Sequence, residues 1–546
     1  MRSTRRSFLP TLGAALLTGL LAAQAGAETA PELVSGESLY RNGLLPSGQP
    51  VTAQREGSAR LAGAEAACSN CHRRSGLGEI EGSIKIPPIS GPYLFHARAK
   101  GQEDLDVPYV DNMRMDRDPY TADTLARAIR EGIGVDGKPL NYLMPRYTLN
   151  DADMATLIGY LKSMEPLKTR GVVGAVVNLA TIVTPDADPD KRRGMESVLE
   201  QYFADQNAYA LAQSPKRLRA ESMRSNAKRR WQLHVWTLTG APATWEDQLD
   251  RHLVQEPVYA VISGLGGRNW HPVHEFCERA ALPCIFPNLD LPVVAEQDFY
   301  SLYFSKGVLL EAELLAKQIA ADNKAKPVGR VVQIFRADDI GADAAADLKN
   351  AVSGLGIQTL ERPIGNAGGS RLAELLRTLR PDDVAVLWLR PADFALLANV
   401  SVRASRIFAS GLMGGLENTP VPAGWRPVTH LTYPAELPDR RMIGVDFALG
   451  WMVLHHIALL DTRVQVDTYV ACGLIRETLD RMRGSFTADY LIESMEGMLE
   501  HQLVSGYYPA LALAPNERFA SKGGYIVHFA NPAGTKVVPD TDWRVP

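Results

Sequence analysis

The chain has 546 residues, of which 46% are hydrophobic and 22% charged, and its formal net charge is −4. This balance is that of a folded chain of several domains, and it excludes a disordered, collagen-like or coiled-coil protein. Without a positive surplus, binding to nucleic acid through phosphate neutralisation is disfavoured. Five cysteines are too few for a disulfide scaffold, so each of them requires its own explanation.

The first segment, residues 1–27, has the pattern of a signal peptide. Three arginines precede an apolar run over residues 8–23, and Ala25-Gly26-Ala27 fits a cleavage site for small residues. This run is short for a membrane-spanning helix, and no second such run follows. Arg5-Arg6 also resembles a twin-arginine export signal, so both export routes stay open. We expect a soluble protein that is exported to the periplasm.

The next feature is Cys68-Ser69-Asn70-Cys71-His72, the C-x-x-C-H signature of covalent c-type haem attachment. Two thiols one helical turn apart can add to the two vinyl groups of one porphyrin, and the histidine that follows can ligate the iron. A thioredoxin-like pair is disfavoured because residues 61–67 are alanine-rich, and a zinc site because no second C-x-x-C occurs. We predict one covalent haem c, anchored by Cys68 and Cys71, with His72 as an axial ligand.

Met144 is the predicted second axial ligand, because electron carriers with a low-spin haem usually take a methionine sulfur. It lies just before Asn150, which can cap a helix whose apolar residues follow helical spacing. Pro145 stiffens the loop that would present the sulfur. Met113 and Met115 are the alternatives.

Residues 36–167 resemble a class I, mono-haem cytochrome c domain, which is an all-α fold. Besides the haem motif, the resemblance rests on segments 36–40, 87–91, 124–132 and 144–145 and on a final helix. It implies that the carbonyl of Pro88 accepts the Nδ1 hydrogen of the proximal imidazole, with Pro87 and Pro92 as alternatives. It also implies a saturated iron with a relatively high reduction potential, which transfers electrons and does little bond chemistry.

From residue 171 to 546 the pattern changes to short β-branched runs that alternate with helical stretches, as expected of parallel sheets. The predicted strands are residues 258–263, 283–286, 330–335, 383–389 and 406–409, and the predicted helices are residues 270–281, 307–320, 343–354 and 370–379. This rhythm predicts an α/β module of two doubly wound lobes with a cleft between them.

The order of these pieces resembles a type I periplasmic binding protein of the branched-chain amino-acid-binding group. The resemblance rests on segments 263–267, 282–287 and 338–341. It implies two lobes that close on a small ligand, with Ser263 as a candidate contact. Asp339 and Arg390 lie at later strand ends and are further candidates. The glycines after Ser263 are equally explained by a tight turn between strand and helix.

Three residues of one predicted helix, His271, His274 and Cys277, stand at spacings of three, and Cys284 begins the next strand. This arrangement permits a metal site. In an exported protein a disulfide between Cys277 and Cys284 is preferred, and a pair of buried thiols is the other alternative. Cys472 is then predicted to be a single buried thiol.

The two halves together predict a periplasmic electron-transfer protein with one haem. It would accept electrons from a periplasmic dehydrogenase and pass them towards a terminal oxidase chain, while the C-terminal module binds a small molecule or docks a partner. The alternative is a solute-binding protein of an ABC-type uptake or sensing system with an accessory cytochrome domain. An enzyme is disfavoured because no nucleophile, metal cluster or acid–base pair stands out in the sequence.

Overall fold

The computed structural model describes residues 30–546 except positions 56, 58–59, 82–83, 97–117, 165–168, 213–227, 296–297, 366–367, 402, 405, 483–484, 500–505 and 516. The predicted signal peptide and the alternative ligands Met113 and Met115 lie outside these described residues. The chain divides into a smaller unit, Met1–Cys68 with Tyr120–Ser163, and a larger unit, Ser69–Pro119 with Met164–Pro546. The span 36–167 expected for a cytochrome domain therefore contributes to both units.

The smaller unit contains the helices α1 (Ala30–Asn42), α4 (Ala122–Glu131) and α5 (Asp151–Ser163). Helices α1 and α5 approach closely at Gly36, where a Cβ would lie 2.6 Å from Tyr160 Cβ. The rings of Tyr40 and Tyr160 pack beside this point, with centroids 5.5 Å apart. Helix α4 begins at a capping box of Thr121 and Thr124 and ends at Gly132, which has a φ of 73°.

The smaller unit also holds a three-stranded antiparallel sheet in the order β2 (Arg60–Ala62), β1 (Thr52–Gln54), β5 (Arg146–Thr148). The expectation of an all-α domain was therefore wrong in this respect. Each of these strands has three residues, and such a short segment cannot show the alternation by which a strand is recognised in a sequence.

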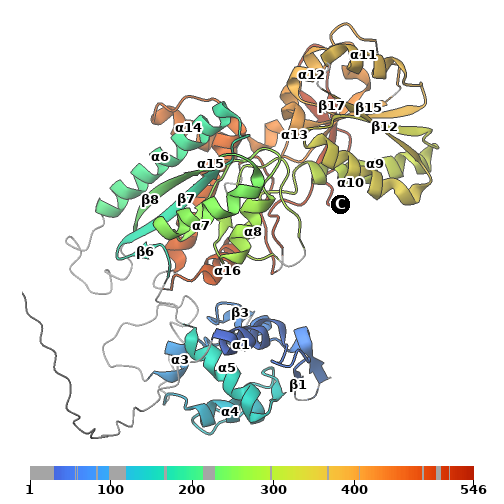
Figure 1. The fold of residues 1–546 in the computed structure, drawn as a ribbon. Helices are drawn as coiled ribbons and strands as arrows, with labels where there is room; N and C mark the ends of the chain where they lie inside the picture. Colours follow the sequence, from blue (N-terminus) through green and yellow to red (C-terminus); the bar gives the residue numbers. More distant parts are fainter. Residues whose placement is uncertain are drawn as a thin grey trace, which may run out of the picture. The chain divides into compact units, whose positions relative to one another are not determined.

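The first lobe of the larger unit is built on β7 (Val176–Val183), which pairs in parallel with β8 (Arg230–Thr237) and with β9 (Ala260–Ile262). The short strands β10 (Cys284–Ile285) and β11 (Ser301–Leu302) continue the parallel sheet, and β6 (Val172–Val173) pairs antiparallel with the start of β7. The helices of this lobe are α6 (Pro189–Ala212), α7 (Trp245–Gln255), α8 (His271–Arg279), α14 (Pro438–Leu454), α15 (Thr462–Met482) and α16 (Ala488–Leu499) (Figure 1).

The second lobe has a sheet in the order β13 (Gln358–Ile364), β12 (Arg330–Arg336), β14 (Asp383–Trp388), β15 (Arg406–Ser410), β16 (Thr429–Tyr433), β17 (Tyr525–Phe529), β18 (Val537–Pro539). The first five strands are parallel, and the last two are antiparallel. Strand β14 is buried along its whole length, as expected of a central parallel strand covered on both faces. The helices include α9 (Val308–Ala325), α10 (Gly341–Val352), α11 (Gly368–Arg377), α12 (Pro391–Ala395) and α13 (Gly411–Gly414).

The prediction of two α/β lobes is confirmed, and each strand and helix predicted between residues 258 and 409 is present. The sheets are mixed rather than purely parallel, because the chain returns through β17 and β18 to the edge of the second sheet. The chain passes between the lobes three times, after β11, after β16 and after α16 (Figure 1). No described helix combines the length and the apolar character that crossing a membrane requires.

Candidate functional site

The larger unit contains a cavity where the carboxyl ends of parallel strands from both lobes meet. Its walls include residues 287–289 and 303–305, which follow β10 and β11, and residues 434–435, which follow β16. The space between the atoms is about 500 Å³, counting the part that is open to solvent. Ligands of open α/β sheets bind outside the carboxyl ends of the strands, so this cavity is the candidate site.

Asn288 presents an amide to this cavity. Its Nδ2 donates to Ser263 Oγ at 2.8 Å and to Thr468 Oγ1 at 3.3 Å, and those two hydroxyls lie 2.8 Å apart. The side chain is only 6% exposed, and its Oδ1 has no hydrogen-bond partner in the described structure. The predicted contact Ser263 is fully buried and does not line the cavity, so its hydroxyl orients Asn288 instead.

Arg463 and Asp467 line the cavity from one face of α15, four residues apart. Arg463 Nη2 donates to Asp290 Oδ1 at 2.6 Å, and its Nη1 lies 3.9 Å from Asp467 Oδ2. Asp467 is 2% exposed, accepts a hydrogen bond from the Tyr508 hydroxyl, and has no partner at Oδ1 in the described structure. Burial raises the pKa of Asp467 to about 7, against the opposing charge of Arg463.

Asp290 joins the two lobes through charged contacts. Besides Arg463, its carboxylate meets Arg390 Nη1 of the second lobe at 3.2 Å and Lys191 Nζ at 4.0 Å. Against the effect of burial, these three cations hold the pKa of Asp290 far below its usual range. Arg390 also binds Asp339 through two hydrogen bonds of 2.8 and 2.9 Å. The predicted candidates Asp339 and Arg390 therefore lie together, but they pair with each other and do not line the cavity.

Five residues that line the cavity were not predicted from the sequence: Asn288, Arg463, Asp467, Tyr507 and Tyr508. For Asn288 a signal was available, since it follows a predicted parallel strand as Ser263 does. A second signal was the pair of opposite charges on the buried face of a helix. Nothing in the local sequence marks the two tyrosines, because only the return of the chain after α16 brings them to the cavity.

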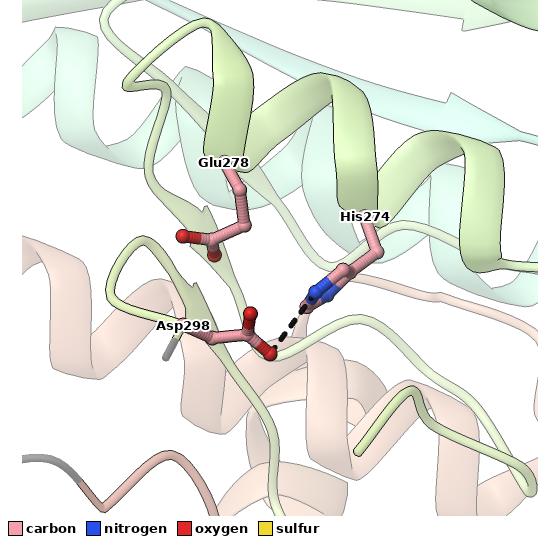
Figure 2. A group of neighbouring side chains, drawn as sticks. All are labelled: His274, Glu278 and Asp298. Carbon is pink, nitrogen blue, oxygen red and sulfur yellow. Dashed lines mark ion pairs between the residues drawn. The ribbon is translucent and has the colours of Figure 1, made fainter. Parts of the chain in front are cut away.

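His274, Glu278 and Asp298 form a separate cluster between α8 and β11 (Figure 2). His274 Nδ1 meets Tyr303 Oη at 2.8 Å, and its Nε2 pairs with Asp298 Oδ2 at 3.0 Å. The Glu278 carboxylate accepts backbone N–H groups of residues 299–301 at 2.8 to 3.1 Å. Both nitrogens of the His274 imidazole and both carboxylate oxygens of Glu278 have protein partners. The cluster therefore connects α8 to the segment that leads into β11.

The possible metal ligands His271, His274 and Cys277 of α8 do not face one common site. His271 is exposed and pairs with Glu275 at 3.1 Å, whereas His274 points into the core. Cys277 and Cys284 are buried free thiols in hydrogen-bond contact with each other. The preferred disulfide was therefore wrong for this structure, and the alternative of two thiols describes it. Burial, followed by the contact with Cys284, raises the pKa of Cys277 well above its ordinary value.

His72 ends the short helix α2 (Ser69–His72) in the larger unit and is buried. Its Nδ1 meets the carbonyl oxygen of Pro87 at 3.0 Å. The expectation of Pro88 was therefore wrong by one residue, because the chain after β4 (Ile84–Ile86) turns the preceding carbonyl towards the ring. Burial lowers the pKa of His72, against the opposing effect of this bond.

The residues after His72 contact α16 within the same unit. Arg73 Nη2 pairs with Glu496 Oε2 at 2.5 Å, and the Ser75 hydroxyl donates to Glu493 Oε2 at 2.5 Å. The guanidinium of Arg74 lies over the Phe299 ring, 4.0 Å from its centroid. These contacts attach the segment that carries His72 to the first lobe.

Of the remaining haem candidates, Cys71 belongs to α2 of the larger unit, and Cys68 and Met144 belong to the smaller unit. The thiol of Cys68 lies 4.0 Å from Tyr147 Oη, which donates to the carbonyl of Ala66 at 2.8 Å. Met144 is half-buried in the loop before β5, where its N–H donates to Asn141 O at 3.1 Å.

Cys68, Cys71, His72 and Met144 are residue types that can anchor a c-type haem and ligate its iron. Neither Cys68 nor Cys71 takes part in a disulfide. Because Nδ1 of His72 is engaged with Pro87, its Nε2 is the nitrogen left for a metal. His72 and Met144 would supply the nitrogen and sulfur ligands of iron.

The chain matches no family model, and no characterised protein matches its sequence. Its fold is similar to that of a branched-chain amino acid ABC transporter protein from Thermus thermophilus solved with bound valine. That match has a TM-score of 0.52 and 12% identity, and it covers 69% of this chain and 98% of the other. A fatty acid ABC transporter substrate-binding protein from Thermomonospora curvata matches with a TM-score of 0.52 and 14% identity, over 70% of this chain and 95% of the other. The chain therefore contains a two-lobed fold of the type I periplasmic binding protein kind.

Proposed function

We propose that this chain is an exported solute-binding protein of an ABC-type uptake or sensing system. The observation that carries the proposal is the cavity between the lobes, where Asn288 and Asp467 each present a buried oxygen without a protein partner. An unpaired buried acceptor is costly, so its retention in a cavity favours a site that a ligand completes. The similarity of the fold to an ABC transporter protein solved with bound valine and to an ABC transporter substrate-binding protein supports the same function.

The arrangement of the cavity explains how a ligand would stabilise the closed form. Residues of both lobes contribute walls, and the pair Asp290–Arg390 joins the lobes next to them. A small molecule in the cavity adds contacts to both lobes at once, so it binds the closed arrangement more tightly than an open one.

Solute binding can be measured by the thermal unfolding of the full-length protein. All eight tryptophans lie beyond residue 230, so their fluorescence reports on the α/β lobes alone. We expect at least one compound among small amines, acids, alcohols and amides to raise the unfolding midpoint in a concentration-dependent manner. The variant Asn288→Leu, which removes both polar atoms of that side chain, should weaken this effect about tenfold. If no compound class shifts the midpoint, solute binding in this cavity is wrong.

A second function, the carrying of one covalent haem c, is favoured by the C-x-x-C-H motif and by the bond between His72 Nδ1 and the Pro87 carbonyl. Cys68 and Cys71 would anchor the porphyrin, while His72 and Met144 would hold the iron. Such a haem supplies reversible one-electron chemistry. The Pro87 carbonyl fixes the orientation of the imidazole and makes it a better donor. The redox partners expected from the sequence, a periplasmic dehydrogenase and a terminal oxidase chain, find no support in the comparisons.

The variant Met144→Ala tests the haem ligands in full-length protein from a host that attaches c-type haem. Loss of the sulfur should lower the reduction potential and let carbon monoxide bind the ferrous iron, because one axial position becomes open. Met154→Ala, which removes a buried core residue of α5, is the matched control and should leave both properties unchanged. An unchanged potential without carbon monoxide binding in Met144→Ala contradicts the ligand, and protein without covalent haem contradicts the site.

A further inference from the structure

Some polar groups of the cavity have hydrogen-bond partners within the protein, and others have none. Two of its donor groups are engaged within the protein: Asn288 Nδ2 binds Ser263 and Thr468, and the Tyr508 hydroxyl binds Asp467. Arg463 is held by the carboxylate of Asp290 at 2.6 Å. Among the described residues that line the cavity, the buried side-chain atoms without a hydrogen-bond partner are two acceptors, Asn288 Oδ1 and Asp467 Oδ1. A ligand that complements this cavity therefore brings hydrogen-bond donors.

The charges around the cavity disfavour an added anion. Asp290 meets the cations Arg463, Arg390 and Lys191, and Arg390 is shared with Asp339. With Asp467 the group holds three carboxylates for three cations. A carboxylate on the ligand would approach Asp467, and the three cations are already balanced by the three carboxylates. It would therefore add a buried charge that is not compensated, which is strongly disfavoured.

The apolar part of the wall suits a cation with a hydrocarbon body. Phe304 and Tyr508 stack with their ring centroids 5.2 Å apart, and Leu412 and Leu416 line the cavity from the second lobe. Aromatic faces attract an organic cation. Gly506 stands near Asp467 Oδ1, since a Cβ on it would lie 3.9 Å away, so no side chain from this position covers the carboxylate.

We propose that the cavity binds a small organic ammonium ion without a carboxylate, which donates hydrogen bonds to Asp467 Oδ1 and Asn288 Oδ1. This inference rests on the proposed solute-binding function and names the ligand class of the same site. The carboxylate of Asp467 is the counter-ion, and the hydrocarbon part of the ligand lies against the aromatic and leucine side chains. Burial raises the pKa of Asp467 to about 7, so at pH 8 its ionised form prevails.

Matched probes separate this ligand class from the others. The full-length protein is titrated at pH 8 by calorimetry with 3-methylbutylammonium, 3-methylbutanol, 3-methylbutanoate and leucine, which share one branched hydrocarbon body. A second set with a phenyl body, 2-phenylethylammonium and phenylalanine, allows for a larger ligand. We expect an ammonium compound to bind at least tenfold more tightly than its amino acid, its alcohol or its acid.

Two variants test the residues. Asp467→Asn keeps the side-chain shape and removes the charge, so it should weaken ammonium binding tenfold or more. Glu493→Gln removes another buried carboxyl, on α16 and outside the cavity, and should leave the affinity unchanged. Tryptophan emission of each variant checks that the lobes are folded, and Asn288→Leu provides a second test if Asp467→Asn does not fold.

The outcomes distinguish this inference from the function on which it rests. Tighter binding of leucine, the acid or the alcohol, or unchanged ammonium affinity in Asp467→Asn, overturns the ligand class and leaves solute binding standing. Absence of binding by every compound of both sets overturns the ammonium proposal, and if the broad compound panel also fails, the solute-binding function falls with it.

Discussion

At the scale of single residues, position in the sequence and position in space differ in informative ways. Ser263 ends a strand as predicted, yet its hydroxyl faces Asn288 and Thr468 inside the wall of the cavity. Asp339 and Arg390 form an ion pair with each other and do not line the cavity. Two side chains that line the cavity, Asn288 and Asp467, have an unsatisfied buried oxygen, and burial raises the pKa of Asp467. Such groups are a common mark of functional residues.

Cys277, Cys284 and Cys472 provide a prediction at this scale. Burial raises the pKa values of Cys277 and Cys472, so at pH 8 these thiols stay protonated and inaccessible to an aromatic disulfide reagent. In a variant with Cys68→Ala and Cys71→Ala, purified without reductant, we expect no reactive thiol in the native state and three after unfolding in denaturant. Detection of a single thiol after unfolding would show that Cys277 and Cys284 form a disulfide.

At the scale of elements, α9 links the lobes and carries a buried carboxyl to the ends of two strands. Glu311 Oε1 accepts hydrogen bonds from Leu412 N–H at 2.9 Å and from the Thr432 hydroxyl at 2.8 Å, and Oε2 accepts from the Ser410 hydroxyl. Ser410 ends β15 and Thr432 lies in β16. Glu311 thus fixes the start of α13, from which Leu412 reaches the cavity.

The variant Glu311→Gln tests the role of the buried Glu311 carboxyl through the pH dependence of the unfolding free energy. Burial raises the pKa of Glu311 from 4.5 to about 7, against its three hydrogen bonds. A raised native pKa adds stability that is complete below pH 4.5 and is lost as the pH rises through about 7. The shift corresponds to about 3 kcal/mol. We therefore expect the unfolding free energy of the unmodified protein to fall between pH 5 and 8, and the variant to fall less steeply.

Two further buried carboxyls, Asp467 and Glu493, have a pKa raised to about 7 by burial and add to the same fall. Glu311→Gln should therefore remove only part of it. Glu374→Gln, at an exposed position of α11, is the control and should not alter the slope. If the unfolding free energy depends on pH equally in Glu311→Gln and in the unmodified protein, Glu311 is already ionised in the folded state throughout the range from pH 5 to 8.

At the scale of the whole larger unit, three chain crossings and several ion pairs connect the lobes; Arg441 of α14, for example, pairs with Glu417 of the second lobe at 2.6 Å. Arg390 of the second lobe reaches Asp290, and Arg268 of the first lobe reaches Asp343 at 3.3 Å. At the first crossing Gly307 has a φ of 58°, and a Cβ there would lie 2.1 Å from the Asp290 carbonyl oxygen. Only glycine fits so close an approach, so the crossing segment is held against the loop that carries the cross-lobe pair.

The local sequence was sufficient for the strands and helices predicted between residues 258 and 409, and it contains the C-x-x-C-H motif, from which haem attachment stays a prediction. The strands and helices predicted between residues 258 and 409 are present because their apolar periodicity is a property of neighbouring residues. The same holds for Cys68, Cys71 and His72, whose spacing is fixed by the chain itself. Short strands such as β1 and β5 escaped prediction because three residues carry no periodicity and gain their order from their partners.

The sequence by itself therefore determined the α/β rhythm of this protein, whereas covalent haem attachment and cleavage of a signal peptide stay predictions from their motifs. Only the tertiary structure decided that Pro87 rather than Pro88 meets His72, that Cys277 and Cys284 are thiols, and which side chains line the cavity. The physical reason is that hydrogen bonds and charge pairs depend on the direction of each side chain. That direction is set by packing between segments that lie far apart in the sequence, such as β10, α15 and the chain after α16.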